Sequence, residues 1–310
     1  MLLKSKDIIG LYDMSAEEIS LILKSATTMK QLLMQNAKKM PHLQGKSVVS
    51  LFYENSTRTR LSFELAAKYL GATFSNLGVS TSSVNKGETL FDTGRTIEAM
   101  ETDVIVIRHP FAGTPKYLAD RFSGSVINAG DGMHEHPTQA LLDMFTMKEK
   151  FGGISGLKVT IIGDITHSRV ARSNLWGLTK LGAKVTLCGM NTMMPTEIEQ
   201  TEAIVTNNLE QAVSDADVVM TLRIQKERLE GEFFPSLREY HNFFGVNEAV
   251  LKICKKDVLI MHPGPVNRGV ELSSPVVDAD FSAINTQVTN GVAIRMALLY
   301  LLTRRKNYDA

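Results

Sequence analysis

The sequence predicts an α/β protein made of two domains, each with a mainly parallel sheet flanked by helices. The chain has 310 residues, which is more than one ordinary hydrophobic core holds and suits two domains of about 150 residues each. Helical patterns alternate with short β-branched runs, as is typical of parallel sheets connected by helices. The most glycine-rich stretch, residues 151–156, separates two such series.

The elements follow from hydrophobic periodicity. In residues 1–150 we expect strands near 47–53, 72–77, 103–108 and 125–129, and helices near 15–35, 60–70, 87–100, 114–122 and 136–150. In residues 151–290 we expect strands near 157–163, 184–188, 203–206, 217–222 and 257–261, and helices near 168–182, 195–201, 208–214 and 246–255. A final apolar segment near 291–306 has too little polar face for a solvated helix, so it must pack against another element.

The charge composition implies that any selectivity for anions must be local. Lys plus Arg number 34 and Asp plus Glu number 33, so no global charge indicates nucleic acid or an anionic membrane as a partner. Cys188 and Cys254 lack a CxxC spacing, which predicts buried thiols in a reducing compartment. The N-terminus lacks the pattern of a secretory signal, and no apolar run approaches a membrane span, so we expect a cytoplasmic location.

Ser56-Thr57-Arg58-Thr59-Arg60 is the most informative segment. It lies between an apolar run and a helical pattern, where a strand leads into a helix. The first N–H groups of a helix, the positive end of its dipole, hydroxyl donors and a guanidinium together favour a phosphate. The alternative is a well-capped, solvated helix start.

Further basic residues follow other predicted strands. Arg108, Arg223 and His262 each come directly after an apolar run. In an open parallel sheet the ligand lies beyond the carboxyl ends of the strands, so these residues predict a polyanionic ligand. A surface ion pair is the alternative for each arginine taken alone.

His136 and Gln139 open a predicted helix, with Pro137 in its first turn. Because they are three residues apart, they project from one face, where they can donate to a substrate carbonyl. A capping histidine without substrate contact is the alternative. His134 and His136 alternate like metal ligands, but no third ligand follows at a recognisable distance, so we expect no metal.

The segment from Gly163 to Ala171 also joins a strand to a helix, but it lacks G-x-G-x-x-G, which argues against a dinucleotide site. Arg169 at this helix start suits a carboxylate instead. Arg223 and Gln225, two residues apart beyond a strand, point to the same side and suit a second carboxylate.

The segment Phe52–Glu64 closely resembles the phosphate-binding motif of the aspartate and ornithine carbamoyltransferases. The resemblance continues in order through Lys86-Gly87-Glu88-Thr89, Arg108-His109-Pro110, His136-Pro137-Thr138-Gln139-Ala140-Leu141-Leu142-Asp143, Gly163-Asp164 with Ser168-Arg169-Val170, Arg223-Ile224-Gln225 and His262-Pro263-Gly264-Pro265. The chain is most similar to the catalytic chains of the aspartate branch of this family.

This resemblance implies a carbamoyl-phosphate domain in residues 1–150, joined by a returning C-terminal helix at 291–306, and an aspartate domain in residues 151–290. The implied carbamoyl-phosphate ligands are Ser56, Thr57, Arg58, Thr59, Arg108, His136, Gln139 and Pro265, and the implied aspartate ligands are Lys86, Arg169, Arg223 and Gln225. Catalysis would rest on Arg58, Thr59, Lys86, Arg108 and His136. Because carbamoyl phosphate is already activated, no covalent enzyme nucleophile is needed, and we expect no cofactor.

The polar loop at residues 78–87 resembles one that the family inserts into a neighbouring subunit's site. Lys86, and less firmly Ser83, would therefore act in the next chain of a homotrimer with shared active sites. The sequence does not reveal whether regulatory chains bind.

Three other functions are open at this point. An ornithine carbamoyltransferase would have a His-Cys-Leu-Pro pattern where this chain has His262-Pro263-Gly264-Pro265, and Arg223 suits an acidic second substrate. A nucleotide-binding oxidoreductase rests on fold alone. A non-catalytic subunit would have to keep every polar motif unused.

Overall fold

The computed structural model describes residues 3–35, 38–78, 86–224 and 236–305. The chain divides into two compact units. The first contains Met1–Phe145 and Val288–Ala310, and the second contains Thr146–Gln287. Each has one parallel sheet with helices, so the predicted fold class is confirmed, and the C-terminal segment belongs to the first unit as expected.

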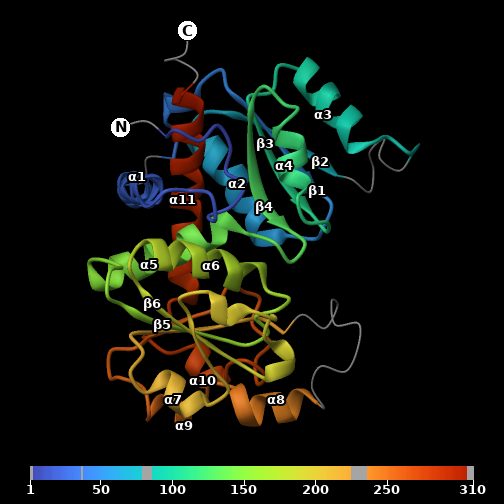
Figure 1. Cartoon of the computed structure of the whole chain (residues 1–310). Coiled ribbons are helices and arrows are strands. Elements are labelled where there is room, and N and C mark those ends of the chain that lie inside the picture. Colours follow the sequence, from blue (N-terminus) through green and yellow to red (C-terminus); the bar gives the residue numbers. More distant parts are fainter. Residues whose placement is uncertain (1–2, 36–37, 79–85, 225–235, 306–310) are drawn as a thin grey trace. The chain divides into compact units, whose positions relative to one another are not determined.

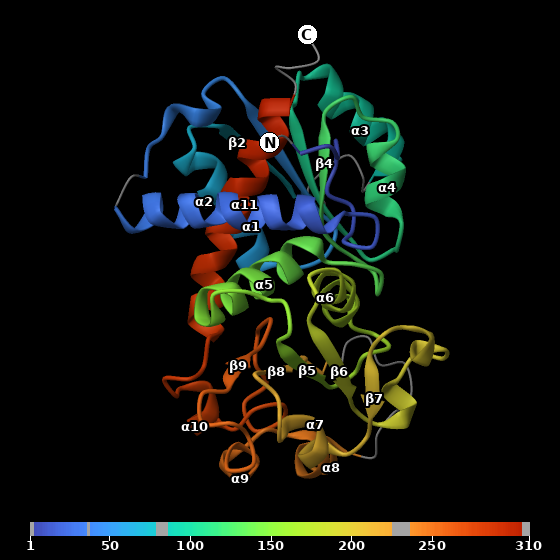
Figure 2. The ribbon, with the colours of Figure 1, turned by 60° about the vertical axis from the view of Figure 1, so that its left-hand side comes forward.

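The sheet of the first unit has four parallel strands in the order β2-β1-β3-β4. They are β1 (Ser47–Phe52), β2 (Thr73–Gly78), β3 (Val104–His109) and β4 (Ser125–Asp131). Helices α3 (Leu90–Ala99) and α4 (Thr114–Ala119) lie on one face, and α2 (Thr57–Tyr69) and α11 (Ile284–Arg305) lie on the other, where α1 (Ala16–Met34) crosses α11 (Figures 1 and 2). The unit also contains the short turn η1 (Pro41–Leu43) and most of α5 (Pro137–Phe151).

Burial explains why this sheet forms from its β-branched runs. Val104 to Ile107 are buried along β3, and every residue of β4 is buried. Leu51, Ile105 and Ile107 pack with Ile97 of α3 and Leu118 of α4 in one apolar cluster. The parallel register places Phe52 beside Arg108 and His109 beside Asp131, so the polar residues gather at one edge of the sheet.

The second unit has a five-stranded parallel sheet in the order β7-β6-β5-β8-β9. Its strands are β5 (Lys158–Ile162), β6 (Lys184–Cys188), β7 (Ile204–Thr206), β8 (Val218–Thr221) and β9 (Leu259–Met261). Its helices are α6 (Arg169–Lys180), α7 (Leu209–Val213), α8 (Leu237–Phe244), α9 (Glu248–Leu251) and α10 (Ser274–Val277), with the short turns η4 (Asn191–Met193) and η5 (Ile198–Gln200).

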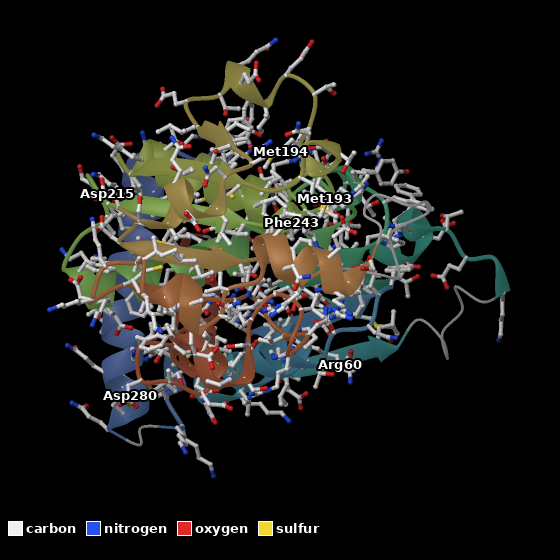
Figure 3. The ribbon with its side chains drawn as sticks, turned by 90° about the horizontal axis from the view of Figure 1, so that it is seen from below. Arg60, Met193, Met194, Asp215, Phe243 and Asp280 are labelled. Atoms are coloured by element: carbon white, nitrogen blue, oxygen red, sulfur yellow. The ribbon has the colours of Figure 1, made fainter. Side chains whose placement is uncertain are left out.

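Charged residues hold the amino ends of the central strands. Asp217 accepts a hydrogen bond from the Lys158 N–H at 2.8 Å and pairs with Lys255 at 2.8 Å. Asp215, labelled in Figure 3, pairs with Lys158 and with Lys255. The amino edge of this sheet is therefore occupied by ion pairs.

Two predicted helices of the second unit are wrong in extent. The expected helix at 195–201 is only the turn η5, because Glu197 adopts a left-handed φ of 63° that interrupts a helix. The expected helix at 246–255 is reduced to α9, since the Val246 N–H bonds the Glu271 carbonyl and Asn247 caps the helix that follows.

Helix α8 was not predicted, although its cap is visible in the sequence. The Ser236 side chain accepts the Glu239 N–H at 3.1 Å, and Tyr240 and Phe244, four residues apart, are buried. Phe243 projects from the same helix and is exposed (Figure 3). The short α10 was likewise not predicted. Helix α11 begins at Ile284, earlier than expected, and its first turns bury the polar residues Gln287 and Asn290.

Both cysteines are free thiols. Cys188 is buried in β6, as expected, and burial raises the pKa of its thiol to about 12. Cys254 is only half-buried, which corrects the prediction, and burial raises its pKa to about 11. Among the described helices, none is both long and apolar enough to cross a membrane.

Candidate active site

The start of α2 carries the predicted phosphate-binding residues. Ser56 is the N-cap, with an extended backbone, and Thr57, Arg58 and Thr59 form the first turn. Thr57 and Arg58 are exposed, whereas Thr59 is buried. The Ser62 hydroxyl donates back to the Arg58 carbonyl at 2.7 Å and to the Thr59 carbonyl at 3.0 Å, which stabilises this turn. The positive end of the helix is thus presented beyond β1.

The N-cap of α2 differs from most others in this chain. The cap side chains of α1, α3, α6, α7, α8 and α9 each accept a backbone N–H of their own helix. Within the described part of the chain, Ser56 makes no such bond. The Ser56 hydroxyl and the first backbone N–H groups of α2 therefore do not bond to each other. This is expected where a bound anion accepts hydrogen bonds from them.

Arg108 lies next to this turn, because β3 neighbours β1. Its backbone carbonyl accepts the Tyr53 N–H at 2.9 Å. Its guanidinium Nε donates to Glu54 Oε2 at 3.0 Å, and both side chains are largely buried. Since one carboxylate holds Nε, the plane of the guanidinium is fixed beside the start of α2.

His109, which the sequence analysis did not single out, also lies at this edge. Its ring packs on Tyr53, with ring centroids 4.6 Å apart. Its Nδ1 accepts the Phe111 N–H at 3.1 Å, which requires a lone pair on Nδ1. Burial lowers the pKa of His109 and favours the same neutral form.

His136 and Gln139 lie beyond β4, at the start of α5, and both are buried. The connection before them is held by carboxylates. Asp131 accepts the Gly113 N–H at 2.8 Å, and Glu135 accepts the Leu11 N–H at 2.7 Å. Burial alone would raise the pKa of Asp131, but hydrogen bonds from His134, Asn128 and Gly113 outweigh it and lower the pKa.

The Gln139 side chain is oriented by its own helix. Its Nε2 donates to Asp143 Oδ1 at 3.0 Å, one turn further along α5. One amide N–H of Gln139 is therefore committed to a buried carboxylate.

In the second unit, Arg169 is buried in the first turn of α6, which Ser168 caps by accepting the Ala171 N–H at 3.1 Å. The preceding turn contains Asp164, whose carboxylate lies 2.8 Å from His167 Nδ1. Gly163 has a φ of +136°, and a Cβ there would lie 3.0 Å from Leu222 Cβ, so this turn requires glycine.

Arg223 follows β8 and is half-buried. The next residue is held by Glu271, which sequence reasoning did not identify. Glu271 is buried and accepts the Ile224 N–H at 2.7 Å, the Asn267 N–H at 2.9 Å and the Asn267 amide at 2.7 Å. Burial raises its pKa. One carboxylate thus ties the segment after β8 to the segment after β9.

His262 follows β9 and is buried. Its N–H donates to Gln287 Oε1 at 3.1 Å, and its Nδ1 accepts the Gly264 N–H at 2.8 Å. Pro265 is exposed, after a cis Gly264–Pro265 bond. Since β5, β8 and β9 are adjacent and parallel, Arg169, Arg223 and Pro265 all follow the same edge of their sheet.

Three further residues were predicted for the site, namely Lys86, Ser83 and Gln225. Lys86 is described and exposed, shortly before α3. Ser83 and Gln225 lie outside the described residues. No group of three or more His, Cys, Asp or Glu suited to a metal ion occurs within the described ranges.

Two family models match almost the whole chain. Residues 6–149 match the aspartate/ornithine carbamoyltransferase carbamoyl-P binding domain, and residues 155–302 match the Asp/Orn binding domain of the same family. The chain belongs to the aspartate/ornithine carbamoyltransferase family. The resemblance inferred from the motifs is thereby confirmed.

Individual relatives span the full length. The chain is 65% identical over 310 residues to the aspartate carbamoyltransferase catalytic subunit of Acetivibrio thermocellus, covering 100% of this chain and 99% of the relative. It is 63% identical to that of Ruminiclostridium cellulolyticum, covering 98% and 97%.

Two solved structures of this family share the fold. The aspartate transcarbamoylase of Trypanosoma cruzi, in complex with N-(phosphonacetyl)-L-aspartic acid, is 33% identical, with a TM-score of 0.88 and coverage of 96% of each chain. An ornithine carbamoyltransferase from Pyrococcus furiosus is 31% identical, with a TM-score of 0.86 and coverage of 97% of this chain and 98% of that chain. Fold similarity alone does not separate the two substrates, whereas the relatives of higher identity are aspartate enzymes.

Proposed function

We propose that this chain transfers the carbamoyl group of carbamoyl phosphate to the α-amino group of L-aspartate, giving N-carbamoyl-L-aspartate and phosphate for de novo pyrimidine biosynthesis. The observation that carries this proposal is the 65% identity, over the whole chain, to an aspartate carbamoyltransferase catalytic subunit. The late motif His262-Pro263-Gly264-Pro265 supports aspartate over ornithine.

The phosphate of carbamoyl phosphate binds at the start of α2, through Ser56, Thr57, Arg58 and Thr59. The uncapped helix start supports this assignment, because the Ser56 side chain accepts no backbone N–H of α2 and the first N–H groups of a helix have no partner within it. Arg58 is exposed in the first turn and stabilises the charge that develops on the leaving phosphate.

The carbamoyl group is held by Thr59, Arg108, His136, Gln139 and the Pro265 backbone. The Glu54 contact supports the role of Arg108, because a guanidinium already held at Nε loses little freedom on binding. Donors aimed at the carbonyl oxygen stabilise the oxyanion that forms when the amine attacks.

Aspartate binds through Arg169, Arg223, Gln225 and Lys86. Two guanidinium groups match its two carboxylates, each bidentately. Arg223 and Arg169 both follow the carboxyl edge of the sheet in the second unit, which supports a common ligand.

The reaction needs no covalent enzyme intermediate. The aspartate nitrogen forms a bond to the carbamoyl carbon, the carbonyl electrons move to oxygen, and the bond to the phosphate oxygen breaks as the carbonyl reforms. The proton lost by the amine goes to the departing phosphate, which is the candidate acceptor. Orientation and charge stabilisation account for the rate.

The test is an assay of purified protein with carbamoyl phosphate and aspartate, ornithine or no acceptor. We expect N-carbamoyl-L-aspartate and an equal amount of phosphate with aspartate only. Citrulline from ornithine, or phosphate release that is independent of acceptor, would contradict the proposal. The cytoplasmic location remains a prediction.

We further propose a homotrimer with shared sites, in which Lys86 and Ser83 act in the neighbouring chain. Lys86 is exposed in a polar segment, which supports a role outside its own unit. Mixing inactive Arg58→Ala chains with inactive Lys86→Ala chains under subunit exchange tests this. A mixed trimer contains one wild-type interface, so activity should return to at most about a third of the wild-type level.

Native mass spectrometry confirms that exchange has occurred. Continued inactivity in confirmed mixed trimers would show that Lys86 acts in its own chain. That outcome would leave the transferase assignment standing, since it concerns only which chain donates the lysine. A regulatory chain is not part of this proposal.

A further inference from the structure

We propose that the buried Asp143 carboxylate, with the buried Arg295 guanidinium as its counter-charge, orients the Gln139 amide, and that both are positioning residues for carbamoyl transfer. The inference rests on the proposed function, because Gln139 is assigned to the carbamoyl group there. All three residues belong to the first unit, with Gln139 and Asp143 on α5 and Arg295 on α11.

The Asp143 carboxylate determines which end of the Gln139 amide faces it. Gln139 is 8% exposed and Asp143 is 0% exposed, and Gln139 Nε2 lies 3.0 Å from Asp143 Oδ1. A carboxylate only accepts hydrogen bonds, so the amide nitrogen must face Asp143 and the amide oxygen must face away. Without the charge, the two amide orientations would differ little in energy.

Arg295 balances the buried carboxylate. Its guanidinium interacts electrostatically with Asp143 and stacks near the Phe63 ring, 5.1 Å from the centroid. Arg295 is 3% exposed, and burial lowers its pKa to about 10 although Asp143 acts in the opposite direction. An isolated carboxylate at this depth would instead tend to take up a proton.

The chain makes room for this arginine. A Cβ at Gly291, one turn earlier on α11, would lie 2.5 Å from Arg295 Nη1. A glycine inside a helix costs stability relative to alanine. A buried ion pair is also often no more stable than apolar residues of the same size. The glycine at position 291 and the buried charges are both explained if Asp143 and Arg295 orient the Gln139 amide, and do not act only through stability.

A double-mutant cycle between Asp143→Asn and Gln139→Ala tests the inference. Asp143→Asn keeps the size of the side chain but lets either end of the Gln139 amide face it. We expect this change to lower kcat/KM for carbamoyl phosphate by about tenfold to a hundredfold, as displacements of about 1 Å can do. In the Gln139→Ala background it should cost less than about twofold, since residues that act as a unit are not additive.

A matched control comes from α11, the helix that carries Arg295. Thr303 is buried on α11, and its hydroxyl donates to the Leu299 carbonyl at 2.7 Å. Thr303→Val should lower the melting temperature without a kcat/KM effect that depends on Gln139. If Asp143→Asn does not fold, the cycle is run with Asp143→Asn combined with Arg295→Met, which removes both charges together.

The outcomes separate the two proposals. A wild-type protein that transfers no carbamoyl group would overturn the proposed function itself. With an active wild type, an Asp143→Asn loss of equal size in both backgrounds would show that the pair only stabilises the unit, and the positioning role would be wrong.

Discussion

Arg58→Ala should abolish most turnover while leaving the fold intact. Arg58 is exposed in the first turn of α2, and its backbone carbonyl accepts the Ser62 hydroxyl at 2.7 Å, a contact that survives the substitution. Alanine is also a good helix former. We therefore expect a change in unfolding free energy within about 0.5 kcal/mol.

The loss in rate should be much larger. A charge-assisted contact that strengthens in the transition state is worth about 3–4 kcal/mol, or roughly two to three factors of ten in kcat. Steady-state assays of phosphate release, with thermal unfolding followed in parallel, measure both quantities on the same preparations.

Arg60→Ala is the matched control, because Arg60 carries the same charge as Arg58, lies in the same helix and is also exposed (Figure 3). Two residues along a helix turn the side chain by about 200°, away from the direction of Arg58. Arg60→Ala should therefore keep kcat within about twofold, a change below 0.5 kcal/mol. Equal losses in the two variants would mean that general surface charge, and not the Arg58 contact, supports turnover.

Three further predictions concern other residues. Arg223→Ala should raise KM for aspartate far more than KM for carbamoyl phosphate in steady-state assays, because it removes one carboxylate clamp; equal increases would mean that Arg223 is misassigned. Glu271→Gln should lower the free energy of unfolding by about 1–3 kcal/mol, since an amide N–H would meet a buried backbone donor, and it should also raise KM for aspartate. A lower melting temperature with an unchanged KM for aspartate would limit Glu271 to a structural role. Asp131 has a lowered pKa in the folded state, so its contribution to stability is present above its ordinary pKa of 3.8 and is lost as the pH falls through the folded-state pKa. The melting temperatures of wild type and Asp131→Asn should therefore converge in strong acid. A difference that stays constant with pH would contradict this prediction.

The sheet edge was predictable from the sequence, because apolar runs marked the strands and polar residues followed them directly. Arg108 lies near the carboxyl end of β3, and His136, Arg169 and Arg223 stand just beyond strands or at helix starts, as expected. Short elements were less predictable. A single left-handed residue, Glu197, removed one helix, and a backbone bond from Val246 shortened another. Neither event has a signature in local composition.

The sequence analysis did not identify the carboxylates behind the site. Asp143 lay inside a recognised motif, four residues from Gln139, so its spacing alone could have suggested a contact. Glu271 is distant in sequence from Ile224 and reaches it only because β8 and β9 are neighbours. Pairing of that kind depends on topology, which periodicity does not specify.

A common physical arrangement emerges from these contacts. Glu54 holds Arg108, Asp143 holds Gln139, and Glu271 holds the backbone beside Arg223. In these three places a buried or largely buried carboxylate therefore supports a proposed ligand residue or the backbone beside it. This matters in a chain of net charge +1, because no strong overall field attracts an anionic substrate. Selectivity for phosphate and carboxylates must then come from a few donors held in place, so removing a supporting carboxylate should impair the site even though that group itself repels the ligands.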